Sequence, residues 1–499
     1  MVQQDWMAKW ALYSPQKIAV KEWETGRGLT YGDLNRLGNR LSRHLDSLGI
    51  RCGDRVAVLA ENCLEYVLLF VAAQKTGIVL VPLNYRLTAA EIDYLLENSS
   101  PVMFLAEEKY QGMASGCKEV AQISHHWTIE GLRDFCDPTS TDPGDLSYPT
   151  VEVDEDHPVF ILYTSGTTGF PKGALYSHKM LFWNSINTSM SLLVNSDSRT
   201  VNCMPPFHTG GWNVLTTPFL HHGGYVCLMR KFEAPDLLNA LRAEAPTIFM
   251  GVPTMLKMVA ECPEFGEADF SSLHYLIVGG EPMPVPLIET WYKKGVFVRQ
   301  GFGMTEVGPN LTSLHHEDAI RKKGSIGRPN FYVTIRIAGP DGRDVLPGEA
   351  GELLLKGPMV TPGYWQNAEA TKAAIRDGWF YSGDMVRMDE EGYVYVVDRI
   401  KNMFISGGEN VYPAEVERVL NAHPSVSISA VIGVPDEKWG EAGKAFIVTV
   451  EGVTLDAADI EAYCYTKLAR YKVPRYFVFL EGLPVGATGK INRAALRQQ

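Results

Sequence analysis

The sequence predicts an α/β protein with a large N-terminal domain of open, mostly parallel α/β sheets plus a small β subdomain, and a small mobile α+β C-terminal domain. Three observations support this fold class. Short apolar segments alternate with helical patterns along much of the chain, and several of them run directly into glycine-rich loops. From about residue 330, short strands separated by turns replace the alternation. Alternating strands and helices are typical of parallel α/β sheets.

The first elements can be assigned from local patterns. Thr30 and Asp33 form a capping-box pattern, which predicts the start of a helix. Leucines at positions 34, 37, 41, 45 and 48 give that helix one apolar face, and Gly49 ends it. A strand at 55–60, a helix at 64–75 and a strand at 78–83 follow. The same rhythm predicts further strands at 158–163, 246–250, 275–278 and 296–299.

Length and composition limit the classes of protein that fit. The chain has 499 residues, which allows two or three domains, and it is 45% hydrophobic and 21% charged, as in an ordinary globular enzyme. Its 46 basic and 58 acidic residues give a net charge of −12. Because nucleic-acid binding needs a dense basic surface, this charge argues against a nucleic-acid partner.

We expect a cytoplasmic protein without a transmembrane segment. The eight cysteines contain no C-x-x-C pair, which favours reduced thiols over a zinc site or a disulfide framework. The N-terminus lacks the apolar core of a signal peptide. The longest apolar run, 66–73, is too short to span a bilayer and is expected to be buried.

The chain divides by composition into two expected domains, 1–398 and 399–499. Residues 401–499 carry 11 basic and 11 acidic residues, so the negative charge lies on the first 400. Within the last stretch, 467–499, seven residues are basic and Glu481 is the one acid. We therefore expect the small domain, with its basic end, to act as a lid on the large acidic domain.

Three glycine-rich loops follow predicted strands: 163–173 (YTSGTTGFPKG), 278–284 (VGGEPMP) and 300–306 (QGFGMTE). Ligands of open α/β sheets bind beyond the carboxyl ends of the strands, so we expect these loops to converge on one crevice.

The loop at 163–173 is the strongest candidate for a phosphate-binding loop. Glycines bring backbone N–H groups close to an anion, hydroxyls donate to phosphate oxygens, and a lysine adds a cation. A Walker A loop is excluded because residue 171 is proline. The candidate ligands are Thr164, Ser165, Gly166, Thr167, Thr168, Gly169 and Lys172.

These motifs, from LTYGDLNRLGNRL near the N-terminus to the terminal GKINR, resemble the superfamily of adenylate-forming, AMP-binding enzymes. The resemblance covers nearly the whole chain and is strongest to acyl-CoA synthetases, in particular bacterial fatty-acyl-CoA ligases. It implies that ATP, Mg²⁺ and coenzyme A take part in the reaction.

The resemblance also implies roles for the segment 301–306. Phe302 replaces the usual tyrosine and offers a flat face to adenine, Thr305 a hydroxyl to phosphate, and Glu306 an oxygen ligand to Mg²⁺. Taken alone, Glu306 would more often be a solvated surface acid. The other nucleotide-binding positions implied are Gly280, Glu281, Pro282, Gly301 and Gly303.

The C-terminal third of the chain supplies the remaining implied groups. Asp384 matches the carboxylate that accepts from the ribose hydroxyls, with Arg399 behind it. Lys401 matches the hinge of the small domain, and Gly407 and Gly408 match the passage of the pantetheine arm. Lys490 matches the catalytic lysine, whose charge stabilises the transition state of carboxylate attack on the α-phosphorus.

For the acyl pocket, the segment 205–213 matches the family's P-x-F-H motif. His208 is the candidate gate beside the reacting carboxylate, and a satisfied buried histidine is the alternative. The segment contains no Asp or Glu to pair with a substrate ammonium, which disfavours amino-acid activation. The residues expected to shape the pocket are Gly210, Gly211, Trp212 and Met304.

The sequence therefore predicts an acyl-CoA synthetase that converts a carboxylic acid, first a medium- to long-chain fatty acid and next an aryl or branched acid, into its CoA thioester. Peripheral contact with a membrane is compatible with such a substrate, although no basic amphipathic helix supports it. Two alternatives are an adenylating module that loads a carrier protein and a non-catalytic nucleotide sensor. We expect no carrier domain after residue 499, which disfavours the first alternative, and the presence of Lys172, Glu306, Asp384 and Lys490 argues against a sensor.

Overall fold

A computed structural model of the chain describes residues 4–140, 145, 147–164, 171–280, 283–406, 409–437, 439–468, 470–486 and 491–498. The chain forms two compact units. The first comprises Met1–Ile335 and Leu355–Phe380, and the second comprises Arg336–Leu354 and Tyr381–Gln499. The lid expected at 399–499 lies within the second unit, and its boundary after residue 398 stays a prediction.

The first unit contains a six-stranded sheet in the order β6-β5-β3-β4-β7-β8. Its strands pair in parallel except β7 and β8, which form an antiparallel pair. The predicted open parallel sheet is thus confirmed here. The strands are β3 (Arg55–Leu59), β4 (Val79–Pro82), β5 (Met103–Ala106), β6 (His125–Thr128), β7 (Pro158–Thr164) and β8 (Lys172–Ser177).

Two further sets of strands complete the sheets of the first unit. One sheet has the order β2-β1-β10-β9, made of β1 (Ile18–Glu22), β2 (Gly28–Thr30), β9 (Arg199–Asn202) and β10 (Tyr225–Leu228). The other set runs in order from β11 to β15, parallel as far as β13 and antiparallel beyond it. Its strands are β11 (Ile248–Gly251), β12 (Tyr275–Val278), β13 (Phe297–Phe302), β14 (Thr312–Leu314) and β15 (Ser325–Pro329).

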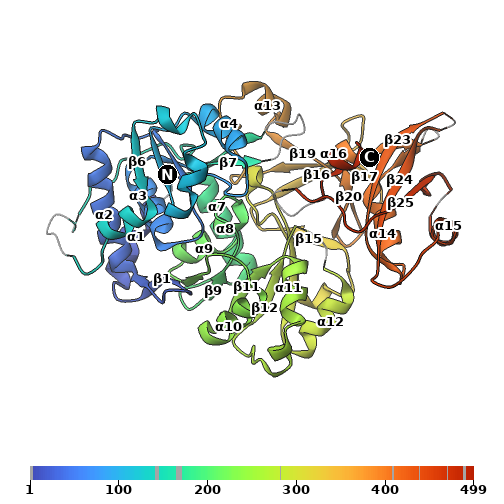
Figure 1. Cartoon of the computed structure of the whole chain (residues 1–499), viewed down its shortest axis with the longest axis horizontal. Helices are drawn as coiled ribbons and strands as arrows, with labels where there is room; N and C mark the ends of the chain where they lie inside the picture. Colours follow the sequence, from blue (N-terminus) through green and yellow to red (C-terminus); the bar gives the residue numbers. More distant parts are fainter. Residues whose placement is uncertain are drawn as a thin grey trace. The chain divides into compact units, whose positions relative to one another are not determined.

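Helices connect and cover these strands, and Figure 1 shows α10, α11 and α12 gathered around β11 and β12. The helices of the first unit are α1 (Trp6–Tyr13), α2 (Tyr31–Ser47), α3 (Leu64–Thr76), α4 (Ala89–Ser99), α5 (Gln111–Ala114), α6 (Ile129–Phe135), α7 (His178–Leu192), α8 (Thr209–Trp212), α9 (Thr216–His221), α10 (Ala234–Glu244), α11 (Pro253–Ala260), α12 (Val285–Lys293) and α13 (Ala368–Ala374).

Helices α2 and α3 show how local sequence and packing combine. Thr30 and Asp33 form the predicted capping box, and the leucines at 34, 37, 41 and 45 are buried on one face of α2. Leu48 is the C-cap, and Gly49 follows it with φ +79°. Every residue of α3 is buried, as expected for the apolar run at 66–73. An all-round apolar helix of this kind forms the centre of a core rather than its rim.

The second unit contains two sets of strands. Strand β16 (Thr334–Ala338) runs from the first unit into the second, and β17 (Ala350–Lys356) runs back from the second into the first. Strand β19 (Trp379–Met388) runs into the second unit again, where β20 (Val394–Arg399) pairs with it. The second set has the order β22-β21-β24-β23, with β25 beside β24. The remaining elements are β21 (Phe404–Ser406), β22 (Glu409–Val411), β23 (Val426–Asp436), β24 (Gly440–Thr449), β25 (Tyr476–Phe479), α14 (Pro413–Asn421), α15 (Ala457–Tyr465) and α16 (Arg493–Leu496).

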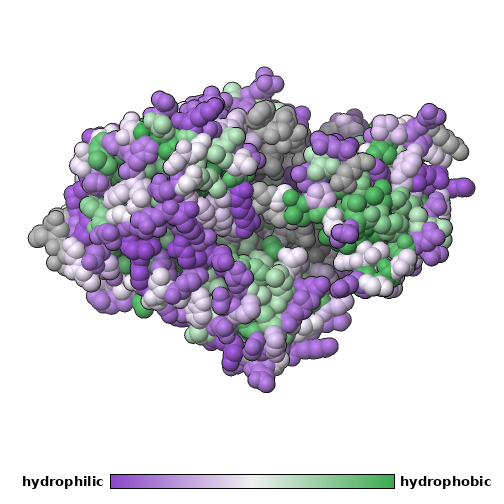
Figure 2. Space-filling model, viewed as in Figure 1, coloured by the Kyte–Doolittle hydropathy of each residue, from purple (hydrophilic) through white to green (hydrophobic). Residues whose placement is uncertain are grey.

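The surface of the second unit carries apolar residues on the face seen in Figure 2, over β24, β25 and α14. Exposed apolar side chains of this unit include Ile405, Ile428 and Phe479. Within the described part of the chain, no helix combines the length and the apolar character needed to cross a bilayer.

Candidate functional site

The ends of the phosphate loop are held by the hairpin of β7 and β8. Thr164, the last residue of β7, pairs with Lys172, the first residue of β8, and its hydroxyl donates to the Lys172 carbonyl over 3.4 Å. The hydroxyl of Tyr94, on α4, donates to the carbonyl of Pro171 over 3.3 Å. Strand pairing therefore fixes where the loop leaves and rejoins the sheet.

The loops after β12 and β13 lie side by side because their strands pair in parallel. A Cβ atom built on Gly279 would lie 3.6 Å from the carbonyl oxygen of Gly301. A Cβ atom on Gly303 would approach the carbonyl oxygen of Pro309 to 2.1 Å, so a larger residue at 303 would displace the backbone that follows. Gly280 has φ +87°, which side-chain-bearing residues rarely adopt.

The end of β7 and the loop after β13 meet at Glu306. The hydroxyl of Thr164 donates to Oε1 of Glu306 over 3.3 Å, although β7 and β13 belong to different sheets. The Lys172 ammonium lies 5.6 Å from the centroid of the Tyr364 ring, and the Tyr364 hydroxyl donates to the same Glu306 oxygen over 3.1 Å. These contacts bring together the ends of β7 and β13, whereas the convergence of the three loops themselves stays a prediction.

Tyr364 and Thr361 were not predicted from the sequence. The Thr361 N–H donates to the Glu306 carbonyl over 2.7 Å, and Trp365 N–H donates to the Gly173 carbonyl over 2.7 Å, so this segment joins both loops. Burial is the main cause of a raised pKa for Tyr364, and the charge of the nearby Glu306 carboxylate is the second cause. The Tyr364 hydroxyl therefore stays protonated and can donate. The one hint in the sequence is an aromatic pair directly after Pro362-Gly363.

The other residues of the 301–306 motif are half-buried. Phe302 ends β13, and its carbonyl accepts from Leu311 N–H over 3.0 Å, which turns the chain back beside the motif. Met304 precedes the single 3₁₀ turn formed by Thr305–Val307. The adenine contact of Phe302 and the phosphate contact of Thr305 stay predictions.

Glu306 is a suitable magnesium ligand on chemical grounds. Proteins commonly bind Mg²⁺ through one or two carboxylates, with phosphate oxygens of the nucleotide and water completing the shell. A single carboxylate that accepts from Thr164, the residue before the candidate phosphate loop, fits this pattern. Among the described residues, a three-membered group of potential metal ligands occurs only at His315, His316 and Glu317, outside these loops.

In the second unit, Asp384 and Arg399 form an ion pair across strands β19 and β20. The Arg399 Nε lies 2.9 Å from Oδ1 of Asp384, whose side chain is 3% exposed, whereas the Arg399 side chain is 46% exposed. The neighbouring Asp398 accepts from Ala414 N–H over 2.7 Å and from the Asn402 amide over 3.1 Å. Asp398 thereby anchors the N-terminus of α14 to β20.

The predicted acyl segment forms the short helix α8. His208 is its N-cap residue, and the ring centroids of His208 and Phe207 are 4.6 Å apart. A Cβ atom on Gly211 would lie 2.3 Å from the Pro205 carbonyl oxygen, so this glycine permits a close backbone approach. A Cβ atom on Gly210 would meet only Met204 Cε, at 3.7 Å.

Trp212 is 3% exposed and belongs to the core of the first unit. Its ring packs against the rings of Tyr66, Phe70 and Phe160, with centroid distances of 5.4 to 5.7 Å. Its indole N–H donates to the Pro206 carbonyl over 2.8 Å. These contacts are those of a structural residue, and a lining role for Trp212, as for Met304, stays a prediction.

Several predicted site residues lie outside the described residues. They are Ser165, Gly166, Thr167, Thr168, Gly169, Glu281, Pro282, Gly407, Gly408 and Lys490, and the same holds for the side chain of Lys401.

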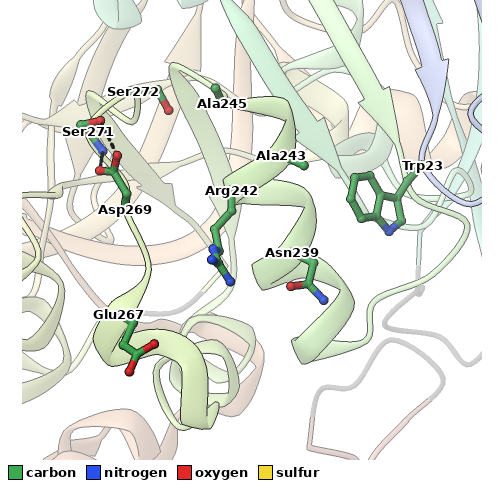
Figure 3. Close-up of a pocket in the computed structure, with 9 residues that line it drawn as sticks. All are labelled: Trp23, Asn239, Arg242, Ala243, Ala245, Glu267, Asp269, Ser271 and Ser272. Carbon is green, nitrogen blue, oxygen red and sulfur yellow. Dashed lines mark hydrogen bonds between the residues drawn. The ribbon is translucent and has the colours of Figure 1, made fainter.

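A separate open cavity of about 540 Å³ lies beside α10 (Figure 3). Arg242 points into it from the helix, and Asp269 accepts hydrogen bonds from the Ser271 backbone N–H and hydroxyl at its edge. None of the residues that line the cavity belongs to the predicted loops. The cavity is therefore distinct from the cluster around Glu306.

Comparison with known proteins agrees with this arrangement. Residues 7–365 match the AMP-binding enzyme family, and residues 415–490 match the AMP-binding enzyme C-terminal domain. A feruloyl-CoA synthase of Amycolatopsis sp is 39% identical over 494 residues, which cover 99% of this chain and 98% of the relative. The long-chain-fatty-acid–CoA ligase FadD13 of Mycobacterium tuberculosis is 38% identical over 500 residues, with coverage of 99% and 98%.

Solved structures give the same result. The ATP-bound structure of MatB from Rhodopseudomonas palustris superposes with a TM-score of 0.89 at 31% identity, covering 100% of this chain and 99% of the other. The structure of MenE from Bacillus subtilis with its acyl-adenylate OSB-AMP has a TM-score of 0.86 at 31% identity, with coverage of 99% and 98%. By sequence motifs, fold and the match over residues 7–365, the chain belongs to the AMP-binding enzyme family.

Proposed function

We propose that this enzyme is an AMP-forming CoA ligase that activates an apolar carboxylic acid, a medium- to long-chain fatty acid in the first instance. In the first half-reaction, a carboxylate oxygen attacks the α-phosphorus of MgATP, and the bond to the β-phosphate oxygen breaks to release pyrophosphate. In the second, the CoA sulfur attacks the acyl carbonyl, the thiol proton is lost to solvent, and AMP leaves. The substrate carboxylate is itself the nucleophile, so no separate nucleophilic side chain is needed.

The contact of Thr164 with Glu306 carries this proposal. It joins, over 3.3 Å, the hydroxyl of the residue that precedes the candidate phosphate loop to a candidate Mg²⁺ ligand in the turn after β13. MgATP presents phosphate oxygens and a metal ion close together, so it suits a site in which these two groups are neighbours. MenE, a relative of known structure, has been solved with ATP and a magnesium ion.

The roles of the remaining residues belong to the same proposal. Lys172 and the loop it follows hold the phosphates, Phe302 stacks on adenine, and Asp384 binds the ribose. Lys490 supplies the cation for adenylate formation. The lid at 399–499 turns about Lys401 between the half-reactions, so that the pantetheine arm passes Gly407 and Gly408.

The apolar character of the substrate is supported by the surroundings of Gly210. A Cβ atom built there would have one neighbour within 4 Å, the apolar Cε of Met204 at 3.7 Å. Open space beside an apolar side chain suits an acyl chain. The segment 205–213 adds no carboxylate that would pair with a charged group on the substrate.

An aryl acid is the second candidate, and two relatives with aryl acids in their names support it. Besides the feruloyl-CoA synthase, an indoleacetate–CoA ligase of Aromatoleum aromaticum is 37% identical over 498 residues. These identities are close to the 38% of the fatty-acid ligase FadD13. A flat aromatic acid needs a slot of the same apolar character but of a different shape.

A panel of acids with free CoA tests the proposal. Octanoate, dodecanoate, hexadecanoate, ferulate and indole-3-acetate are compared by kcat/KM, with AMP and acyl-CoA quantified by mass spectrometry. We expect at least about 10-fold preference for one of the fatty acids, equivalent to ~1.4 kcal/mol. A preference of that size for ferulate or indole-3-acetate would show that the substrate is an aryl acid and not a fatty acid. Adenylate formation without acyl-CoA would favour the loading of a carrier protein.

A paired variant tests the acyl site. Gly210→Val fills the space in front of Met204 and should lower kcat/KM for hexadecanoate at least about 10-fold more than for octanoate. Gly266→Val is the matched control, because a Cβ atom there has no neighbour within 4 Å. If kcat/KM falls by the same factor for hexadecanoate and octanoate, Gly210 does not line the acyl pocket.

A further inference from the structure

A buried asparagine on α7 lies between two segments that the proposed function assigns to different substrates. Asn184 is 1% exposed and stands on the buried face of the helix with Leu181, Ser185 and Thr188. One neighbour is the end of α8, which follows His208 in the acyl segment. The other is the stretch directly after Glu306 in the nucleotide segment.

The amide of Asn184 makes one hydrogen bond to each segment. Its Nδ2 donates to the carbonyl of Asn213, the C-cap residue of α8, over 2.7 Å. Its Oδ1 accepts from the N–H of Asn310, four residues after Glu306, over 3.3 Å. Both partners are backbone groups with fixed donor and acceptor character, so the orientation of the amide is determined.

The surroundings leave little freedom for either segment. Gly308 has φ +77°, and a Cβ atom there would lie 3.1 Å from Oδ1 of Asn184, so the turn after Glu306 packs directly on this amide. The side-chain amide of Asn310 donates to the carbonyls of Asn213 (3.4 Å) and Val214 (3.1 Å) and to the hydroxyl of Thr188. The nucleotide segment is thus hydrogen-bonded both to α7 and to the end of α8.

We infer that Asn184 is a positioning residue that couples nucleotide binding after Glu306 to the placement of α8 and His208. The inference rests on the proposed roles of residues 301–306 and 205–213. When MgATP orders Glu306, the turn at Gly308 and the Asn310 N–H are held in place, and the Asn184 amide transmits that order to the Asn213 carbonyl. An amide suits this position because it donates on one side and accepts on the other, and a buried group that fails to do both is destabilising.

Comparing variants of Asn184 with variants of another buried asparagine on the same helix separates an effect on coupling from an effect on folding. Asn184→Asp keeps the acceptor for Asn310 but removes the donor to Asn213. Asn187→Asp is the control, because Asn187 is also fully buried on α7 and its Oδ1 accepts from Tyr332 N–H over 3.0 Å, outside both segments. Asn184→Ser and Asn187→Ser form a second, neutral pair, which is used if a buried carboxylate prevents folding.

Hydrogen exchange measures the coupling without any acid substrate. With magnesium and the non-hydrolysable analogue AMPCPP, the parent enzyme should gain protection in peptides covering 304–311 and also 208–214. The Asn184 variants should keep protection at 304–311 and lose at least about half of that at 208–214, whereas the Asn187 variants should behave like the parent. Protection of 208–214 that survives in the Asn184 variants, or that is missing in the parent, would overturn the inference.

Acid affinity provides the second measurement. Dodecanoate and ferulate are titrated with and without magnesium AMPCPP, and the ratio of dissociation constants gives the coupling. We expect a ratio of at least about 5 in the parent and the Asn187 variants, and less than about 2 in the Asn184 variants. Equal ratios in both pairs would overturn the inference. Because the exchange experiment needs no acid, a wrong substrate assignment would leave its result unchanged, so the two proposals fail separately.

Discussion

The hydroxyl of Tyr364 donates to Oε1 of Glu306 over 3.1 Å. The two residues are 58 positions apart, and each comes from a segment that also contacts the phosphate-loop hairpin. A tyrosine held protonated by burial orients the carboxylate without neutralising it. The relationship suggests that Glu306 is presented to a ligand in one conformation.

Glu306→Gln should lower the rate of adenylate formation by on the order of 10²–10³. Glutamine keeps an oxygen that accepts from Tyr364 and Thr164 but loses the charge that binds Mg²⁺. Tyr364→Phe removes one hydrogen bond and should cost no more than about 10-fold, or ~1.4 kcal/mol. Acid-dependent ATP–pyrophosphate exchange across a magnesium titration measures both. An unchanged magnesium requirement in Glu306→Gln would contradict the metal role.

Asp384→Asn should raise KM for ATP about 10-fold or more, since the amide no longer offers two acceptor oxygens to the ribose hydroxyls. Loss of the ion pair itself should cost little stability, because the Arg399 side chain is 46% exposed and turns to solvent. With 3′-deoxyATP, which lacks one of the hydroxyls, parent and variant should differ much less. If the KM of the variant exceeds that of the parent by the same factor with ATP and with 3′-deoxyATP, Asp384 does not bind the ribose hydroxyl.

Lys490→Ala should strongly slow adenylate formation while transfer from supplied dodecanoyl-adenylate to CoA stays within about threefold of the parent. The expected loss in the first step is on the order of 10²–10³, from the missing charge at the α-phosphorus. Lys467→Ala, an exposed lysine in the same basic stretch, is the control and should leave both steps unchanged. Loss of both half-reactions to the same extent would refute the division of roles.

Two buried histidines should make the first unit sensitive to acid. Burial lowers the pKa of His178 to about 3, and burial together with the adjacent His222 lowers the pKa of His221 to about 3. In the unfolded chain both return to about 6.5, so below that pH the unfolded state binds more protons. Stability is therefore lost as the pH falls from about 6.5 toward 3, by up to about 1.4 kcal/mol per pH unit for each histidine.

The midpoint of urea unfolding between pH 7.5 and 5 checks this pH dependence. His178→Gln and His221→Gln should each flatten the decrease, since glutamine does not titrate. Parallel curves for the parent and both variants would show that neither histidine is responsible.

Much of the local structure follows from the sequence because it depends on residues close together in the chain. The capping box of Thr30 and Asp33 starts α2, and the all-apolar segment of α3 is buried throughout. Strand β12 has the predicted bounds, 275–278, because its apolar run ends at a glycine pair. Other strand ends moved: the strand expected at 246–250 is Ile248–Gly251, and that expected at 296–299 continues to Phe302, since pairing with neighbours decides where a strand ends.

The motifs also predicted that Thr164, Lys172 and Glu306 lie in loops that follow strands, and they singled out Asp384 by its resemblance to the family. Which groups meet was decided by the tertiary structure alone. Tyr364 and Thr361 reach Glu306, and Asn184 joins Asn213 to Asn310, through contacts between residues 29 to 126 positions apart. No local pattern encodes such pairs, because a tyrosine or asparagine acquires its partner only when packing brings two distant backbones together. The sequence by itself determined the chemistry available to this enzyme, and packing decided which of those groups act on one another.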